Sequence, residues 1–483
     1  MGRFNALILA LESVFMLPAF LISLWRGERE SATAFLLSMG IILLIAGILA
    51  LLSRHAKQDF YAREGLICVG SSWILISALG CLPFVLSGAI PNYIDALFEM
   101  VSGFSTTGSS VISDLNVIPK GIIYWRSFSN WLGGMGVLVF LLAIVPVSGQ
   151  SEGFTMHLLR AESPGPDVGK LVPRMRQTAA VLYLSYITLS ILNLIFLLAG
   201  GFSVFDAVCT TFSTAGTGGF GIYNDSFASF SPYVQIVTTV FMLLFGINFS
   251  CYYLLLLRQF RSILRDEELR MYVGVVVVSV ALIAWNLFSA ATRMYDTFSE
   301  ALRHSAFQVA SIITTTGFAT TDFDLWPAFS QAILVLLMFL GACAGSTGGG
   351  LKCARFLLLM KTLRRNVGQI LRPQKVKVIR INEKTIDEKL LANTASYFFV
   401  YMIIICASFL IVSLDGFSFT TNFTAVVSCF NNIGPGLDAV GPTCNFSGFG
   451  ALSKIVLILD MLAGRLEIFP ILILLNPTAW KRG

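Results

Sequence analysis

Four short polar stretches, each ending in glycine, are the residues of this sequence whose types and spacing could do chemistry. They read SGFSTTG (102–108), TTFSTAG (210–216), SIITTTG (311–317) and SCFNNIG (428–434). All fit one pattern: Ser or Thr, any residue, Phe or Ile, then Ser, Thr or Asn, then Thr or Asn, any residue, and Gly. None contains Asp or Glu. Carbonyl and hydroxyl oxygens without carboxylates suit a dehydrated monovalent cation, whereas divalent ions usually require carboxylates.

The shared glycine has a specific use in such a stretch. Successive carbonyls can point the same way only where one residue adopts a backbone conformation that a β-carbon disfavours. Polar glycine loops are common, so a single copy would carry little weight. Four copies in matching positions favour one shared ion site over four ordinary outer loops.

The elements that must position these stretches are membrane-spanning helices. The 483 residues are 56% hydrophobic and only 12% charged, with a mean hydropathy of +0.78, and a soluble protein carries about twice that charged fraction. An apolar run of about 20 residues spans the hydrocarbon core. We expect ten spans, at residues 5–25, 33–53, 66–88, 127–147, 178–200, 232–257, 271–292, 328–360 (interrupted), 393–414 and 449–477.

The distribution of Lys and Arg predicts the orientation of the chain. Basic residues gather in the connections 54–64, 148–177, 258–270 and 352–389, whereas 201–231 and 415–448 contain none. The basic connections therefore face the cytoplasm, and an even number of spans places both termini there. The net charge of +6 reflects this bias and does not indicate nucleic-acid binding.

Each polar stretch follows a segment too short to cross a bilayer, at roughly 93–104, 203–212, 296–313 and 418–430. Non-helical backbone at membrane depth survives only when buried in protein or facing water. Four such re-entrant segments satisfy one another best around a common axis, with their negative C-terminal ends and oxygens directed inward. We therefore predict an all-α integral membrane fold with four pseudo-symmetric helix–pore loop–helix repeats around one central pore, preceded by two extra N-terminal transmembrane helices. The predicted divisions are 1–64 for those two helices, then 65–177, 178–270, 271–392 and 393–483 for the repeats.

Together with the stretches NWLGGMG (130–136), GACAGSTGGGLK (341–352) and AGRLEIFP (463–470), these features identify a family. Over its whole length the chain resembles the TrkH/TrkG-type membrane subunits of the bacterial Trk potassium-uptake system, in the Trk/Ktr/HKT superfamily. The resemblance implies a potassium-channel-like pore in one polypeptide, K⁺ as the transported ion, and no organic cofactor. It also implies a homodimer, a cytoplasmic nucleotide-binding regulatory subunit (TrkA-like), and a place in the bacterial cytoplasmic (inner) membrane.

The resemblance also assigns a selectivity filter that binds K⁺. Its residues would be Thr106, Thr107, Gly108, Ser109, Thr214, Ala215, Gly216, Thr217, Thr315, Thr316, Gly317, Phe318, Asn432, Ile433, Gly434 and Pro435. Only one glycine per turn is shared, so we expect looser selectivity against sodium than in a channel with four identical loops. In plant relatives a serine at the first glycine tends to accompany sodium transport, and Gly108 therefore favours potassium.

The interruption GACAGSTGGG (341–350) breaks the eighth span, because each of its five glycines costs a helix roughly 1 kcal/mol relative to Ala. A phosphate-binding loop is excluded by spacing, since the Lys that must follow the second glycine is replaced by Leu351. Two interpretations remain: a close helix–helix contact, or a mobile polar loop across the pore, as in the resembled family. The gate residues would be Gly345, Ser346, Thr347, Gly348, Gly349, Gly350, Lys352 and Arg465.

Arg465 lies near the middle of the tenth span, where a lone arginine costs at least roughly 2.5–3.5 kcal/mol. At 100° per residue the nearby acids Asp460 and Glu467 lie on other faces of the helix. Arg465 is therefore expected to face the pore beside the 341–350 loop, or else to pair with a neighbouring helix or dimer mate.

Two questions about function stay open at this point. The basic segment 361–389, with Arg364, Arg365 and Lys375, either anchors the topology or also docks a regulatory partner. Transport is either through a gated channel or by a proton- or sodium-coupled symporter. The few intramembrane carboxylates (Glu12, Asp460, Glu467) lie outside the filter stretches, which favours the channel. An enzyme is not expected, because no catalytic constellation or metal motif is present.

Overall fold

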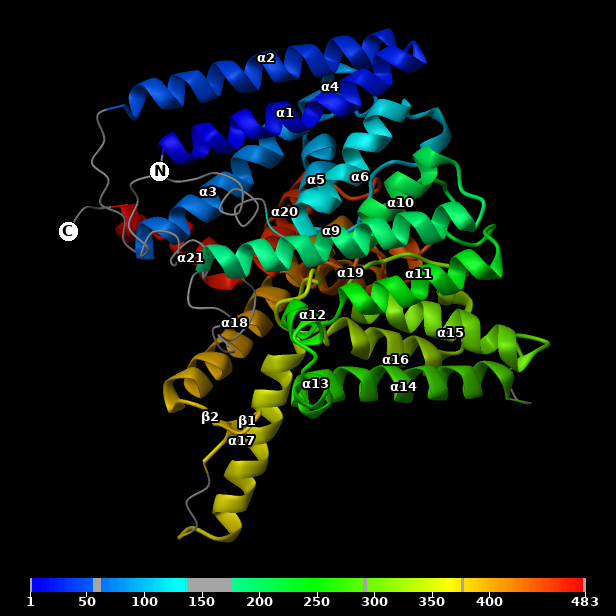
Figure 1. The fold of residues 1–483 in the computed structure, drawn as a ribbon, viewed down its shortest axis with the longest axis vertical. Helices are drawn as coiled ribbons and strands as arrows, with labels where there is room; N and C mark the ends of the chain where they lie inside the picture. The colour runs from blue at the N-terminus through cyan, green and yellow to red at the C-terminus, as the bar shows by residue number, and fades with distance from the viewer. Residues whose placement is uncertain are drawn as a thin grey trace.

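The computed structural model describes residues 2–54, 62–134, 136, 175–289, 293–374 and 378–480, which are predominantly helical (Figure 1). Helices α1 (Gly2–Arg26) and α2 (Arg29–Leu52) form a hairpin along one edge of the molecule. Gly27 turns the chain between them with a φ of 75°, which glycine adopts without strain. The Glu28 carboxylate then accepts hydrogen bonds from the amides of Lys120 (2.8 Å) and Gly121 (3.2 Å). This contact fixes the hairpin to the start of α6.

After this hairpin, one order of elements recurs four times: an apolar helix, a short buried helix, and a further helix. We call these groups units 1 to 4. Unit 1 comprises α3 (Ala62–Gly80), α4 (Leu82–Leu86), α5 (Tyr93–Phe104), η1 (Leu115–Val117) and α6 (Lys120–Gly134); unit 2 comprises α9 (Met175–Ala199), α10 (Val204–Ala215), α11 (Pro232–Phe245), α12 (Phe249–Leu256) and α13 (Phe260–Arg265). Unit 3 comprises α14 (Glu267–Phe288), α15 (Phe298–Ile313), η2 (Phe323–Leu325), α16 (Ala328–Met338) and α17 (Cys353–Leu371). Unit 4 comprises α18 (Glu388–Val412), η3 (Ser413–Asp415), α19 (Phe419–Phe430), η4 (Asp438–Val440), α20 (Ala451–Leu466), α21 (Ile468–Leu475) and η5 (Pro477–Trp480).

The short helices α5, α10, α15 and α19 occupy the predicted re-entrant segments. Each begins at a capping side chain that accepts a hydrogen bond from a backbone amide of the first turn, as these residue types favour. The caps are Asn92 to Ile94, Ser203 to Asp206, Thr297 to Glu300 and Ser418 to Thr421. The second half of each helix is almost wholly buried, so the four helices point their C-terminal ends into the protein.

Among the residues that the structure describes, six segments are long and apolar enough to cross a membrane, and a seventh does so if a bent pair counts as one span. They are Gly2–Arg26, Arg29–Leu52, Glu64–Leu86, Val181–Ala199, Glu267–Phe288 and Glu388–Asp415, with Pro232–Phe245 and Phe249–Leu256 as the pair. The expected span 127–147 lies in α6 as far as Gly134, and nearly all of the rest is outside the described residues, as is most of the basic connection 148–177.

Two of the expected spans are not continuous helices. The run 232–257 is broken after Phe245, and α12 turns away from α11 by 90°. The run 449–477 is broken at Glu467, which has a φ of 64° and whose carboxylate pairs with Arg355. In the eighth span the non-helical part extends from Phe339 to Lys352. Hydrophobicity alone does not reveal such breaks, because the residues on both sides are apolar.

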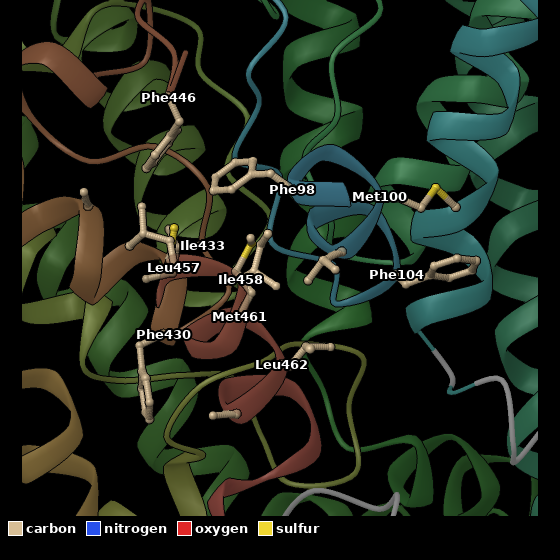
Figure 2. Close-up of a cluster of buried hydrophobic side chains, with 14 of the residues drawn as sticks. Phe98, Met100, Phe104, Phe430, Ile433, Phe446, Leu457, Ile458, Met461 and Leu462 are labelled. Atoms are coloured by element: carbon tan, nitrogen blue, oxygen red, sulfur yellow. The ribbon is translucent and has the colours of Figure 1, made fainter. Parts of the chain in front are cut away.

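Unit 4 packs against unit 1 and so closes the arrangement. Figure 2 shows this contact, in which Phe98 of α5 belongs to the same buried cluster as Leu457 and Met461 of α20. The ring centres of Phe98 and Phe446 lie 5.6 Å apart. The last unit of the chain thus meets the first around a common centre.

Helix α17 projects from the helical body together with the hairpin β1 (Arg380–Ile381) and β2 (Lys384–Thr385) (Figure 1). The two strands are antiparallel, with Arg380 opposite Thr385. Asn382 and Glu383 form the turn with φ values of 47° and 66°, as a tight two-residue hairpin requires. The predicted docking residue Lys375 lies outside the described residues, and Arg365 forms an ion pair with Glu388.

Candidate functional site

Each short buried helix ends in the same backbone turn. The second residue after the helix has a left-handed conformation: Thr106 (φ 57°), Thr217 (52°), Thr315 (58°) and Asn432 (55°). The next residue donates its amide to the carbonyl of a serine five positions earlier, in the pairs Thr107–Ser102, Gly218–Ser213, Thr316–Ser311 and Ile433–Ser428, at 2.8 to 2.9 Å. A glycine with positive φ follows: Gly108 (84°), Gly219 (66°), Gly317 (89°) and Gly434 (105°). The folded motif is therefore Ser, three residues, Thr or Asn, one residue, Gly.

This geometry corrects the expected alignment of the second turn. Gly216 was predicted to match Gly108, but it caps α10 with a helical φ of −68°, and the matching glycine is Gly219. Thr214 and Ala215 consequently lie in the last turn of α10. The segment GTGG (216–219) offers three glycines, and the sequence pattern matched Gly216 when the glycine of the turn is Gly219. Ser213, five residues before Gly218, is the signal that would have given the correct register. The other three predicted sets lie in their turns as expected.

The four glycines approach the neighbouring units closely, in cyclic order. A β-carbon on Gly108 would overlap the carbonyl oxygen of Gly218, one on Gly219 that of Thr316, one on Gly317 that of Ile433, and one on Gly434 that of Thr107. Each glycine thus faces a carbonyl of the next unit, and the fourth faces the first. The carbonyls of Thr107, Gly218, Thr316 and Ile433 form one closed ring, which we call the carbonyl ring.

The carbonyl ring has unused bonding capacity. Within the described part of the chain, none of its four oxygens accepts a hydrogen bond. Buried carbonyls without donors are rare in proteins, and a ring of them replaces the hydration shell of a monovalent cation. The arrangement can therefore hold a dehydrated cation without any charged side chain.

The ring is not fourfold in its side chains. Asn432 stands where the other turns have Thr106, Thr217 and Thr315, and its Nδ2 donates to Thr107 Oγ1 and to the Met461 carbonyl, both at 2.9 Å. Pro435 follows the glycine in the same turn. Unit 4 is thus the most divergent quarter of the ring.

A cavity of about 150 Å³ lies outside the turns and is lined by residues of all four, among them Ser109, Gly219, Gly317 and Gly434. The charged side chain in its lining is Arg126, and this cation is neutralised by Glu99 at 2.5 Å and stacked 3.6 Å from the ring centre of Phe220. The cavity can therefore receive a cation without repulsion from an unpaired arginine.

Carboxylates next to this cavity remain ionised. Hydrogen bonds from Ser418 and Thr421 lower the pKa of Asp438 below its usual value. Hydrogen bonds from the Asn224 side chain and the Asn116 amide lower the pKa of Asp114 in the same way. Both groups are exposed and acidic at physiological pH. The entrance to this cavity, which we call the outer mouth, therefore carries negative charge that attracts cations.

On the other side of the ring, the 341–350 loop fills the break between α11 and α12. The Cys343 amide donates to the Gly246 carbonyl (3.1 Å), and the Phe249 amide donates to the Gly345 carbonyl (3.1 Å). Thr347 Oγ1 donates to the Phe245 carbonyl (3.2 Å). Broken helix ends leave backbone groups without partners, and here the loop supplies them.

The loop then passes directly against two of the four turns. The Gly349 amide donates to Thr315 Oγ1 (2.8 Å). A β-carbon on Gly348 would lie 3.0 Å from the Thr314 carbonyl, and one on Gly350 would lie 3.0 Å from the Asn431 carbonyl. Because residues 339–352 are not helical, this is not the close helix–helix contact considered above. It is a polar loop lying against the turns of units 3 and 4.

Arg465 and Lys352 both contact this loop. Arg465 donates to the Thr347 carbonyl (2.6 Å), to the Gly134 carbonyl (2.6 Å) and to that of Gly133. It therefore joins the loop to the end of α6, across from units 3 and 4. The Lys352 ammonium is fully buried and donates to the Gly348 carbonyl. Arg355 and Glu467 form an ion pair nearby (2.5 Å).

Three features of the site were not expected from the sequence. They are the Glu99–Arg126 ion pair, the break between α11 and α12, and the buried carboxylate of Glu268. A charged residue within the short apolar segment 93–104 was a visible signal for the first. The other two depend on contacts between residues that are 76 or more positions apart in the sequence, which no local pattern predicts.

Comparisons with known proteins agree with this architecture. The family model described as TrkH, cation transport protein, matches residues 32–480. The Trk system potassium uptake protein TrkH of Salmonella typhimurium is 35% identical, covering 98% of this chain and 97% of that protein. The Trk system potassium uptake protein TrkG of Escherichia coli is 33% identical, covering 98% and 96%. The crystal structure of the potassium transporter TrkH from Vibrio parahaemolyticus superposes with a TM-score of 0.87 at 32% identity, covering 100% of this chain and 99% of that one.

Proposed function

Since the chain belongs to the TrkH family of cation transport proteins, which are transporters and not enzymes, we propose that it takes up potassium across the bacterial cytoplasmic membrane through a pore gated by the 341–350 loop. The observation that carries the proposal is the carbonyl ring, in which each glycine of one unit faces a carbonyl of the next. The relatives named as potassium uptake proteins support potassium as the ion.

The proposed filter follows the folded turns. It consists of Thr106–Ser109, Thr217–Phe220, Thr315–Phe318 and Asn432–Pro435, with the ring carbonyls replacing the ion's water. The proposed repeats correspond to units 1 to 4, within 65–177, 178–270, 271–392 and 393–483. One ring with few tight sites is consistent with moderate selectivity over sodium.

The proposed gate consists of the loop and Arg465. The loop lies against the turns of units 3 and 4, and Arg465 links it to the end of α6 in unit 1. A fixed cation at this place repels an arriving cation. Potassium would pass only after the loop, and with it the contact to Arg465, has moved.

A channel fits the described contacts better than a proton- or sodium-coupled symporter. Glu12 packs against Gly80, Asp460 accepts a hydrogen bond from Ser408 (2.8 Å), and Glu467 pairs with Arg355. These carboxylates contact other residues than those of the carbonyl ring, so none is placed to bind a coupled ion there.

The proposed assembly is a homodimer with a TrkA-like nucleotide-binding subunit on the cytoplasmic face. The support is the family and the basic segment 361–389, which projects on α17 and the hairpin (Figure 1). Charge reversal at Arg364, Arg365 and Lys375 should abolish capture of this subunit, and unchanged capture would remove the segment from the docking surface.

The experiment that tests the function is flux into proteoliposomes containing only this chain. Rubidium uptake that exceeds sodium uptake, with no dependence on an imposed proton gradient, is the expected result. Uptake that requires a proton gradient would favour the symporter instead.

A further inference from the structure

Glu268, in the first turn of α14, has a buried carboxylate that the proposed filter and gate do not use. Its side chain is 6% exposed. One oxygen, Oε1, accepts hydrogen bonds from two backbone amides, those of Ala344 (2.6 Å) and Ala354 (3.0 Å). A buried carboxylate is costly unless it is paired or hydrogen-bonded, so these two contacts define what the side chain does here.

The two amides lie on opposite sides of the glycine-rich loop. Ala344 precedes its glycines, and Ala354 lies in the first turn of α17, where amides have no partner within the helix. A negative charge at this helix end is also favourable. One carboxylate oxygen therefore holds both arms of the loop to the same point on α14. The arms also meet each other, since the Gly341 amide donates to the Leu351 carbonyl (2.8 Å).

We call the two hydrogen bonds of Glu268 the clasp, and the basic side chains near it have other partners. Lys361 pairs with Glu267, and Arg355 pairs with Glu467. The Lys352 ammonium donates to the Gly348 carbonyl. Among the described contacts, the hydrogen bonds of Glu268 thus go to the loop arms alone, and their loss would be felt by the loop first.

The residues just before Glu268 are held by the cytoplasmic hairpin. Asn382, in the turn between β1 and β2, donates Nδ2 to Asp266 (2.7 Å), while its Oδ1 accepts from the Glu267 amide (2.9 Å). The Asn382 amide also donates to the Glu267 carboxylate (3.2 Å). The start of α14 is therefore docked on the tip of a hairpin that lies outside the helical body.

We propose that Glu268 is the positioning residue that holds the intramembrane loop against the filter, and that the hairpin Arg380–Thr385 sets the position of this clasp from the cytoplasm. The inference rests on the proposed role of the loop as a gate. Displacing the hairpin would shift the start of α14, withdraw the carboxylate from the two amides, and release both arms of the loop together.

The test compares two substitutions of Glu268 in the full chain, reconstituted without a cytoplasmic partner. Glu268→Ala removes the acceptor, whereas Glu268→Gln keeps an oxygen that both amides can reach. Two buried amides left without an acceptor destabilise the closed state enough to shift a closed–open equilibrium by about tenfold or more. We expect basal rubidium flux to rise by about that factor in Glu268→Ala and to stay within about threefold of the original in Glu268→Gln.

Two further readouts separate a released loop from a damaged fold. The rubidium-to-sodium ratio should be unchanged in Glu268→Ala, because the carbonyl ring is not touched. The buried thiol of Cys343, in the loop arm beside Ala344, should become reactive toward an impermeant reagent added on the cytoplasmic side, as located by mass spectrometry.

The hairpin is tested by Asn382→Gly, which removes the side-chain contacts but tolerates the positive φ of the turn. The matched control is Glu383→Gly, at the neighbouring turn position. We expect a smaller rise in flux for Asn382→Gly and none for Glu383→Gly. The double variant Glu268→Ala/Asn382→Gly should conduct no more than Glu268→Ala alone, because both act on one clasp.

The outcomes distinguish this inference from the proposed function. A wild-type chain without rubidium flux would refute the function itself. A conducting wild type whose flux and Cys343 reactivity are unchanged in Glu268→Ala would refute the clasp and leave the function standing, as would a Glu268→Gln variant that leaks as much as Glu268→Ala. If Glu268→Ala fails to fold, Asn382→Gly against Glu383→Gly decides, and equal flux in those two refutes the hairpin's role.

Discussion

The four turns that carry the carbonyl ring and the 341–350 loop next to them are both rich in glycine, but the glycines have different roles in the two regions. In the four turns, glycines let the backbones of neighbouring units meet in a closed cycle, so that each turn is supported by the next. These glycines are Gly108, Gly219, Gly317 and Gly434. In the loop, Gly348 and Gly350 let a single segment lie close to the turns, while side-chain contacts from Arg465 and Glu268 hold it there. The proposed ion recognition is thus distributed over four similar turns, and the proposed obstruction depends on a few single contacts.

This difference predicts different responses to mutation. Damage to one quarter of the ring should impair selectivity without abolishing conduction, because three quarters remain. Loss of one loop contact should change the fraction of open pores without changing which ion passes. Substitutions in the two regions should therefore change different measured quantities.

Ring substitutions should produce the largest change. We expect Gly108→Ser and Gly219→Ser to lower the rubidium-to-sodium flux ratio by about tenfold or more, because a β-carbon overlaps a ring carbonyl of the next unit and the positive φ adds strain of about 1–2 kcal/mol. Flux of both ions in proteoliposomes measures this. Gly88→Ser is the control, since its φ of 73° carries the same strain with no atom within 4 Å of the added carbon. An unchanged rubidium-to-sodium flux ratio in Gly219→Ser would instead favour Gly216 as the glycine of unit 2 that corresponds to Gly108.

The gate substitution should produce the next largest change, and in a different quantity. Arg465→Ala should raise basal rubidium flux by about tenfold and leave the ion ratio unaltered, because the contacts to Thr347, Gly133 and Gly134 are lost while the ring is intact. Deleting Gly348 and Gly349 should do the same. The combined variant should give less than the product of the two increases, since both act on one barrier. A folded Arg465→Ala protein with unaltered or reduced flux would contradict the proposed gate.

The ion pair between Glu99 and Arg126, at the cavity next to the turns, should matter mainly for the stability of the fold. Arg126→Leu leaves the Glu99 carboxylate buried without its cation, which costs about 3–5 kcal/mol in comparable cases. We expect a clear fall in the thermal unfolding temperature and an ion ratio reduced by only a few-fold. Glu99→Gln combined with Arg126→Leu should recover part of the stability, because no charge is then left unpaired. Equal stability of the single and double variants would show that an unpaired Glu99 carboxylate does not destabilise the fold.

The outer mouth should show the smallest effect. Because hydrogen bonds lower the pKa values of Asp438 and Asp114, both stay ionised as pH falls from 7.5 to 5.5, and their attraction for cations is lost only as pH falls through the lowered values. Half-saturating rubidium should therefore be constant over that range. Asp438→Asn should raise it by about two- to threefold at low ionic strength and less at high salt, since exposed charges are screened. A shift that persists at high salt would indicate direct coordination instead.

The sequence predicted the parts of this protein that depend on local patterns. Asn92 and the apolar residues after it give α5 at the expected residues 93–104. Arg465 donates to the Thr347 carbonyl, so it lies beside the loop, which was one of the two places expected for it. The register of the second turn was wrong because GTGG offers several glycines, which are distinguished in the fold by the backbone bond from Gly218 to Ser213 and by the positive φ of Gly219. The α11–α12 break and the clasp at Glu268 were not predicted, because each is stabilised by the loop near residue 345, which is remote in sequence.

The break between α11 and α12 has a consequence for water. At rest, loop groups satisfy the carbonyls of Phe245 and Gly246 and the amide of Phe249. If the loop leaves, as the proposed gate requires, lipid cannot replace these partners, and unsatisfied backbone groups at membrane depth are costly. Water must then enter the break as the loop departs, so opening the proposed pore and wetting it would be one event. Osmotic stress from solutes too large to enter should then favour the closed state, in proportion to the water that the break admits.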